Sequence, residues 1–123
     1  MRGQRLFVRS IESGDAEAID AFLAANGSPG EAPACGLLGK LVGDLVGIVA
    51  MSIAGDGLHI ENVVVARELR RKRIGRFLLD EAARLAEKID RDRLVVTDAR
   101  GMEGFLRRAG FAQEDGMFVR RVR

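Results

Sequence analysis

The stretch from Leu58 to Leu79, LHIENVVVARELRRKRIGRFLL, most constrains what this chain can fold into. Its three consecutive valines, at positions 63–65, are typical of a strand that is buried on both faces. The charged run 67–73 ends that strand, and apolar residues then recur with helical spacing. The stretch therefore predicts a strand, a basic turn and a helix over residues 73–89. The predicted buried face of the helix consists of Ile74, Phe77, Leu78, Leu85 and Ile89.

Two features of the basic turn favour an anion as its ligand. The first amides of a helix have no intrahelical partner and lie at the positive end of the helix dipole. Gly75, in the first turn of the helix, has no side chain and lets another group approach the backbone closely. We therefore expect a phosphate-bearing ligand here. The basic side chains around it are Arg70, Arg71, Lys72, Arg73 and Arg76.

Length and composition indicate one soluble domain over residues 1–123, with 47% hydrophobic and 31% charged residues. No apolar run approaches the roughly 20 residues that cross a bilayer, and the first ten residues have no signal-peptide core. The chain has one cysteine, Cys35, and one histidine, His59, so an internal disulfide and a zinc site are not expected. These observations predict a cytoplasmic protein without a membrane segment or a metal.

The order of apolar segments predicts a mixed α+β sheet with helices on both faces. Three closely spaced strands predict an antiparallel meander, and strand, helix, strand predicts a parallel pair with a right-handed crossover. Only one helix fits between the first two strands. The expected strands are 5–10, 36–43, 45–54, 58–66, 94–97, 111–113 and 117–122, and the expected helices are 16–25, 73–89 and 102–109. The second and third strands are expected to turn at Gly43-Asp44, and the last two at Asp115-Gly116.

Residues 63–75 resemble the acyl-CoA-binding core of the GNAT superfamily of N-acetyltransferases. That core is a strand with an apolar triplet, four turn residues, and the motif R/Q-x-x-G-x-G/A opening a helix. Here the motif reads Arg70-Arg71-Lys72-Arg73-Ile74-Gly75, with the second glycine present and Arg73 in place of the first. The predicted order of strands and helices is similar to the GNAT fold along nearly the whole chain. Residues 105–111, FLRRAGF, also resemble the family signature F-Y-x-K-x-G-F.

The resemblance implies an enzyme that transfers the acetyl group of acetyl-CoA directly to a primary amine of a small molecule or a peptide. The backbone of Val63 and Val65 would bind the pantetheine arm like an added strand. The amides of residues 71–76 would hold the pyrophosphate. The cofactor-binding residues predicted in this way are Val63, Val64, Val65, Arg70, Arg71, Lys72, Arg73, Ile74, Gly75 and Arg76.

Two residues are candidates for the base that removes the amine proton. Aligned on the valine triplet, the strand position that often supplies a glutamate base in the family falls on His59. The two-residue period of a strand predicts His59, Glu61, Val63 and Val65 on one face. Imidazole titrates near neutral pH and suits proton removal, while Glu61 would orient it or act as the base itself, directly or through water. A histidine at a strand start is also commonly structural, so both interpretations stay open.

The chain departs from the family at two further positions. The tyrosine that protonates the leaving thiolate in relatives falls on Leu106, and the chain contains no tyrosine. The asparagine that contacts the cofactor in many relatives falls near Ala99. Cys35, Ser52 or water would have to replace the acid. These losses favour an alternative function, a non-catalytic module that binds or senses acyl-CoA.

A third interpretation, a basic nucleic-acid-binding domain, depends on charge alone. The end of the chain carries a second basic group, which is either a solvated face or a phosphate-binding one. The chain has no tryptophan or tyrosine to stack on bases, which disfavours nucleic acid. Monomer and homodimer are both compatible with the sequence. The second basic group consists of Arg107, Arg108, Arg120, Arg121 and Arg123.

Overall fold

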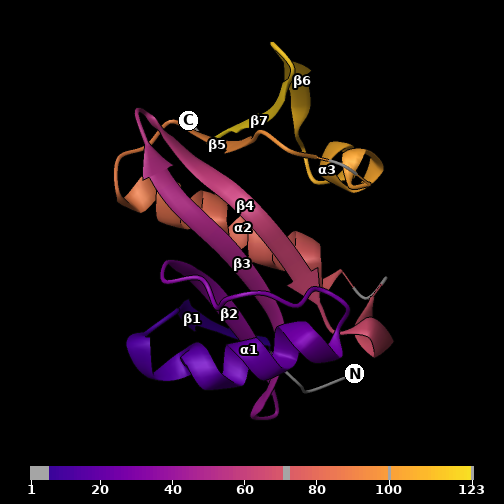
Figure 1. The fold of residues 1–123 in the computed structure, drawn as a ribbon. Helices are drawn as coiled ribbons and strands as arrows, with labels where there is room; N and C mark the ends of the chain where they lie inside the picture. The colour runs from indigo at the N-terminus through magenta and orange to yellow at the C-terminus, as the bar shows by residue number, and fades with distance from the viewer. Residues whose placement is uncertain (1–5, 71–72, 100, 123) are drawn as a thin grey trace.

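The computed structural model describes residues 6–70, 73–99 and 101–122, which form seven strands and three α-helices (Figure 1). The strands are β1 (Leu6–Ser10), β2 (Gly36–Leu41), β3 (Asp44–Ala54), β4 (Gly57–Val65), β5 (Arg93–Val96), β6 (Ala112–Glu114) and β7 (Met117–Arg121). The helices are α1 (Ala16–Ala25), α2 (Ile74–Lys88) and α3 (Glu103–Arg108), with short 3₁₀ turns at Ser13–Asp15 and Arg67–Leu69. No helix among the described residues is long and apolar enough to cross a bilayer.

All seven strands form one sheet in the order β1-β2-β3-β4-β5-β7-β6. Strands β1 to β4 pair antiparallel, which confirms the predicted meander, and β4 pairs with β5 in parallel across α2, as expected. One helix, α1, lies between the first two strands, which also confirms the prediction. Strand β7 lies between β5 and β6, an order that the sequence did not reveal. The sheet therefore contains both parallel and antiparallel pairs, as the predicted mixed α+β sheet implies.

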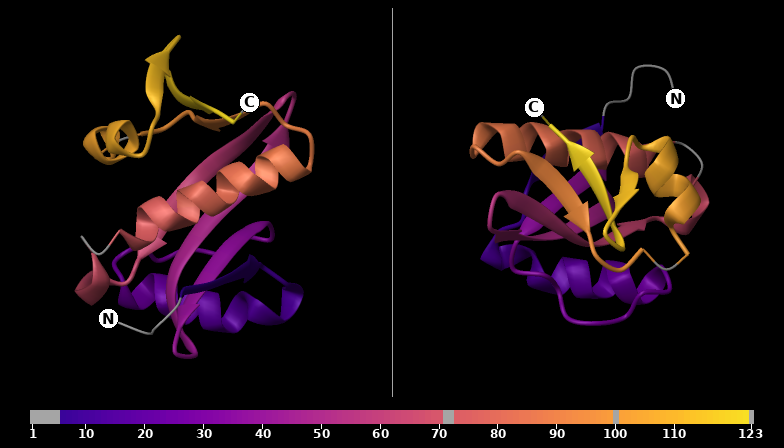
Figure 2. Two further views of the ribbon diagram at one scale, coloured as in Figure 1. Left: turned by 180° about the vertical axis from the view of Figure 1, so that it is seen from behind. Right: turned by 90° about the horizontal axis from the view of Figure 1, so that it is seen from above.

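Helices α1 and α2 cover opposite faces of the central strands (Figures 1 and 2). On the α2 face, a side chain at Gly47 of β3 would lie 2.6 Å from a methyl group of Leu78, so glycine is needed for α2 to pack closely. Ile74 and Leu78 are buried as predicted, whereas Phe77 is 40% exposed. Four further residues that hydrophobic spacing did not single out are also buried on α2, and three of them are small: Leu79, Ala82, Ala83 and Ala86.

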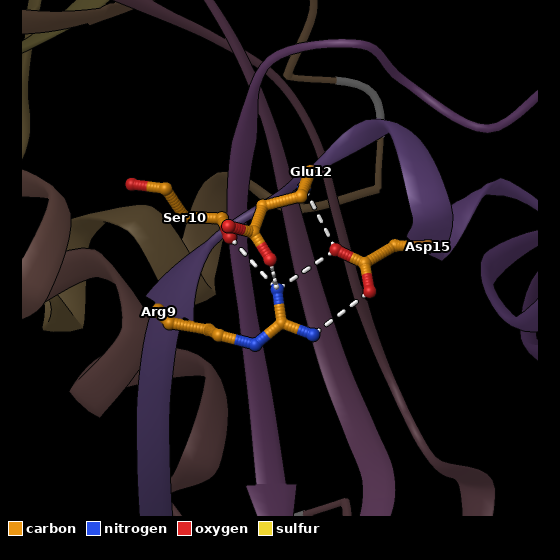
Figure 3. Close-up of polar contacts among 4 residues, drawn as sticks. All are labelled: Arg9, Ser10, Glu12 and Asp15. Carbon is orange, nitrogen blue, oxygen red and sulfur yellow. Dashed lines mark hydrogen bonds and ion pairs between the residues drawn. The ribbon is translucent and has the colours of Figure 1, made fainter.

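An arginine–aspartate pair fixes the corner between β1 and α1 (Figure 3). The two terminal nitrogens of Arg9 each donate to one carboxylate oxygen of Asp15, at 2.8 Å. The same carboxylate accepts the backbone N–H of Glu12 at 2.7 Å. The hydrogen bonds from Arg9, and then that from the Glu12 backbone, hold the pKa of Asp15 well below its usual range.

The two tight hairpins differ in how well the sequence predicted them. The final hairpin turns at Asp115-Gly116, with φ of 50° and 79°, as expected. The β2–β3 hairpin was predicted to turn at Gly43-Asp44, and this prediction is wrong by one residue. The turn residues are Val42 and Gly43, with φ of 52° and 84°, and Leu41 pairs with Asp44. Val42 is thus a β-branched residue in the left-handed region, exposed to 72%.

Candidate active site

The site is created where β4 and β5 separate. They pair only from Gly57 to His59 of β4, whereas β4 runs on to Val65 with β3 alone beside it. The Ala66 N–H donates to the Val46 carbonyl of β3 at 2.9 Å. Because backbone groups alternate in direction along a strand, the N–H and C=O groups of Val63 and Val65 point the other way, toward the open edge. These are the two residues whose main chain was predicted to bind pantetheine.

A cleft of about 730 Å³ follows this open edge. Its walls come from the loop after α1, from β4, from the first turn of α2 and from α3, which converge near the end of β4 (Figure 1). Two predicted cofactor residues, Arg71 and Lys72, lie outside the described residues. The structure places the other eight together around this cleft: Val63, Val64, Val65, Arg70, Arg73, Ile74, Gly75 and Arg76.

The N-terminus of α2 opens into the cleft. Arg73 is the residue that caps it and has left-handed backbone angles, φ 65° and ψ 14°. Glycine adopts this conformation without strain, and this is the position at which the resembling family has its first glycine. No side chain among the described residues hydrogen-bonds to this helix end. The amides of its first turn are therefore oriented for an anion.

Four arginines surround the helix end. Arg70, Arg73 and Arg76 come from the predicted turn and helix, and Arg108 comes from α3. Arg108 was expected only as part of the second basic group and not beside the cleft, although it stands three residues after Phe105 and thus on the same side of a helix as that cleft residue. Arg70 also has a structural role, because its guanidinium donates to the carbonyls of Val65 and Asn26, at 3.2 Å each.

Gly75 brings three elements together. A side chain at this position would lie 3.0 Å from the Phe105 ring of α3 and 3.6 Å from a methyl group of Val65 on β4. The missing side chain thus permits close packing beside the cleft, in addition to any approach of a ligand. The main chain at Gly75 remains on the lining of the cleft.

A β-bulge in β4 changes where the candidate bases lie. Met51 of β3 pairs with Ile60 and Ala50 pairs with Asn62, so Glu61 is an extra residue. His59 pairs with Ser52, and it consequently shares a face with Asn62 and not with Val63 and Val65. The prediction of one face for His59, Glu61, Val63 and Val65 is therefore wrong, because the bulge interrupts the two-residue period.

Glu61 and His59 have different surroundings. Glu61 is exposed and lines a second cavity, of about 310 Å³, on the α1 side of β4, which we call the side cavity. The side cavity shares Asn62 and Val64 with the cleft, so the two adjoin. His59 is half-buried and paired on both sides, to Ser52 and to Val95, and lies outside the linings of both cavities.

The residues that the sequence offered in place of the family's tyrosine lie away from the cleft. Leu106, at the matching position, is fully buried. Cys35 is exposed and Ser52 is half-buried on β3, and neither lines the cleft. Among the described residues, no cluster of three or more histidine, cysteine or carboxylate side chains is arranged to hold a metal.

Comparisons with known proteins agree with the geometry. Residues 6–111 match the family model of the acetyltransferase (GNAT) family. A GNAT-family protein from Desulfovibrio desulfuricans has the same fold, with a TM-score of 0.81 at 15% identity over 97% of this chain and 100% of that one. A GNAT acetyltransferase from Brucella melitensis, solved with acetyl-CoA, gives 0.76 at 18% identity over 95% and 88% of the two chains.

An Escherichia coli GNAT N-acetyltransferase solved with CoA gives a TM-score of 0.75 at 19% identity, over all of this chain and 84% of its own. A search of curated protein sequences found no match. At these identities the structural likeness concerns the fold.

Proposed function

Because this chain belongs to the acetyltransferase (GNAT) family, we propose that it transfers the acetyl group of acetyl-CoA to a primary amine by direct attack. The observation that carries the proposal is the cleft at the open edge of β4. It combines the backbone of an open strand edge, a helix N-terminus and four arginines in one place. Acetyl-CoA matches these features. The amides of its pantetheine arm match the strand backbone, and its phosphates match the helix N-terminus and the arginines.

Each part of the cleft has a role in holding acetyl-CoA. The backbone of Val63 and Val65 supplies donors and acceptors to the amides of the pantetheine arm, as in strand addition. The first turn of α2 receives the pyrophosphate, and Arg73, Arg76 and Arg108 balance its charge. Arg73 replaces a glycine without removing these contacts, because they are main-chain contacts. Arg70 gives up part of its hydrogen bonding to the Val65 carbonyl if the arm uses that oxygen.

The transfer step requires a base and a leaving group. The amine lone pair attacks the thioester carbonyl, a C–N bond forms, the C–S bond breaks, and the amine loses a proton. Glu61 is the better candidate base, because it lines the cavity that adjoins the cleft at Asn62. It takes the proton directly or through water. With Leu106 buried at the position of the family's acid, water protonates the thiolate.

The proposal is tested by measuring the release of free CoA thiol from acetyl-CoA in the presence of primary amines. The rates of the Glu61→Gln and His59→Gln variants are compared with that of the unchanged protein. Glu61→Gln should lower kcat by about a hundredfold or more, with the Kd of acetyl-CoA unchanged. His59→Gln should change kcat by less than about threefold. Loss of turnover in His59→Gln alone would transfer the role of base to the histidine.

One observation favours the second function, an acyl-CoA-binding module without turnover. The position of the family's acid is a fully buried leucine, so no side chain there reaches a thiolate. Saturable binding of acetyl-CoA without acetylation of any amine would establish that module. It would also remove the proposed transfer.

A further inference from the structure

The side cavity is lined by two carboxylates and several apolar side chains. It lies on the α1 side of the sheet, between the loop that follows α1 and the bulged part of β4. Leu23, Pro33 and Ile48 contribute an apolar floor. Its two charged lining residues are Glu31 from the loop and Glu61 from the bulge, and both are carboxylates.

The side cavity meets the cleft at Asn62 and Val64. The amide nitrogen of Asn62 donates to the Ser28 hydroxyl at 3.4 Å, a long hydrogen bond that links β4 to the loop. Ser28 lines the cleft, so this bond lies on the wall between the two spaces. A molecule in the side cavity therefore contacts residues that also line the cleft.

The bulge is what gives the side cavity its second carboxylate. In an unbroken strand Glu61 would share a face with Val63, which faces α2. The extra residue places Glu61 on the lining of the α1-side cavity instead. The backbone conformation of β4 thus places the negative charge of Glu61 next to the cleft.

We propose that the side cavity binds the acceptor and selects a small, positively charged amine with an apolar body and no carboxylate. This inference rests on the proposed acetyl transfer. Two carboxylates attract an ammonium group and repel an anionic one, and none of the described basic residues lines the cavity. The apolar floor packs against the body of the amine. A volume of about 310 Å³ is small for a ligand pocket, so the inserted part is a short alkyl amine.

Three acceptors of equal chain length test this selection: butylamine, diaminobutane and aminobutanoate. They differ only in whether the far end is neutral, cationic or anionic. The inference predicts that butylamine and diaminobutane exceed aminobutanoate in kcat/KM by at least about tenfold. Glu31→Gln should raise KM for diaminobutane several-fold with little change in kcat, and should narrow the discrimination against aminobutanoate.

Glu17→Gln is the matched control, because Glu17 is an exposed carboxylate of α1 outside the lining of the cavity and its loss changes the net charge equally. Glu17→Gln should leave the ratios of kcat/KM among the three acceptors unchanged. Equal use of aminobutanoate, or an effect of Glu17→Gln as large as that of Glu31→Gln, would overturn the inference and leave the acetyl transfer standing. Binding of acetyl-CoA without turnover of any amine would overturn both.

Discussion

Two groups of arginines in this chain differ in their partners. Arg9, Arg120 and Arg121 each pair with a carboxylate, at 2.8 to 2.9 Å. Arg73, Arg76 and Arg108 line the cleft and form no ion pair with another described residue. The first group connects elements of the fold, whereas no described carboxylate balances the positive charge of the second group. The contrast supports the proposal that the cleft binds an anionic ligand.

The largest expected effect is on binding of acetyl-CoA by the double variant Arg76→Gln/Arg108→Gln. Each exposed charge-assisted contact is worth about a factor of ten, so the Kd should rise by about a hundredfold. The free energy of unfolding without ligand should change by less than about 0.5 kcal/mol. Isothermal titration calorimetry and urea unfolding measure the two quantities. Arg84→Gln, on the same helix outside the cleft, is the control and should bind acetyl-CoA normally.

The opposite result is expected for Arg120→Gln. Its guanidinium donates to Asp80 of α2 at 2.8 Å and to the Ala109 carbonyl at 3.2 Å. The side chains of Arg120 and Asp80 are both partly exposed. Loss of the ion pair should therefore destabilise the protein by about 1 kcal/mol. The Kd of acetyl-CoA should remain within twofold. A tenfold loss of affinity here would show that the two groups of arginines are not distinct.

Arg73→Gly separates the backbone of the cleft from its side chains. Glycine relieves the left-handed strain at the N-terminus of α2, and after its own entropic cost the net gain should be about 0.5 kcal/mol. Val42→Asn should give a similar gain at the β2–β3 turn, which is away from the cleft. Only Arg73→Gly should alter binding of acetyl-CoA, and by less than tenfold. Destabilisation by both variants in urea unfolding would refute the assignment of strain.

The smallest effect concerns the half-buried Arg9–Asp15 pair. The folded pKa of Asp15 lies below its ordinary value of 3.8, so the carboxylate stabilises the protein above about pH 4. This contribution is lost as the pH falls through the folded pKa. The stability difference between the protein and Asp15→Asn should therefore shrink on acidification and in high salt. A difference that grows as the pH falls would contradict the pairing in Figure 3.

Local sequence patterns predicted the half of the site that is local in the chain. The valine triplet, the basic turn and Gly75 are contiguous, and the eight described residues predicted from them line one cleft. The Asp115-Gly116 turn was also predicted, because its chemistry depends on two adjacent residues. Gly75 shows the limit of such reasoning, since its neighbour Phe105 is 30 residues away in sequence.

Features that depend on pairing between distant segments were missed. The bulge at Glu61 depends on the register between β3 and β4. No residue type in β4 indicates its position. The insertion of β7 between β5 and β6 is likewise a choice of partner strand. Phe77 was expected in the core because it is apolar, but it is largely outside the buried face of α2. Alanines lie on that buried face, where the helix packs closely against the sheet. The place of Glu61 in the side cavity follows from the bulge, so the sequence alone could not reveal it.

The most direct test of the account is thermal unfolding of the protein with acetyl-CoA and with S-acetylpantetheine, which lacks the phosphates and the nucleoside. Acetyl-CoA at about 100 times its Kd should stabilise the fold by about 2.7 kcal/mol, a shift of several degrees. S-acetylpantetheine at the same concentration should shift the transition far less, because the arginines and the α2 N-terminus have no anion to bind. No shift with millimolar acetyl-CoA, or equal shifts with both compounds, would contradict the account.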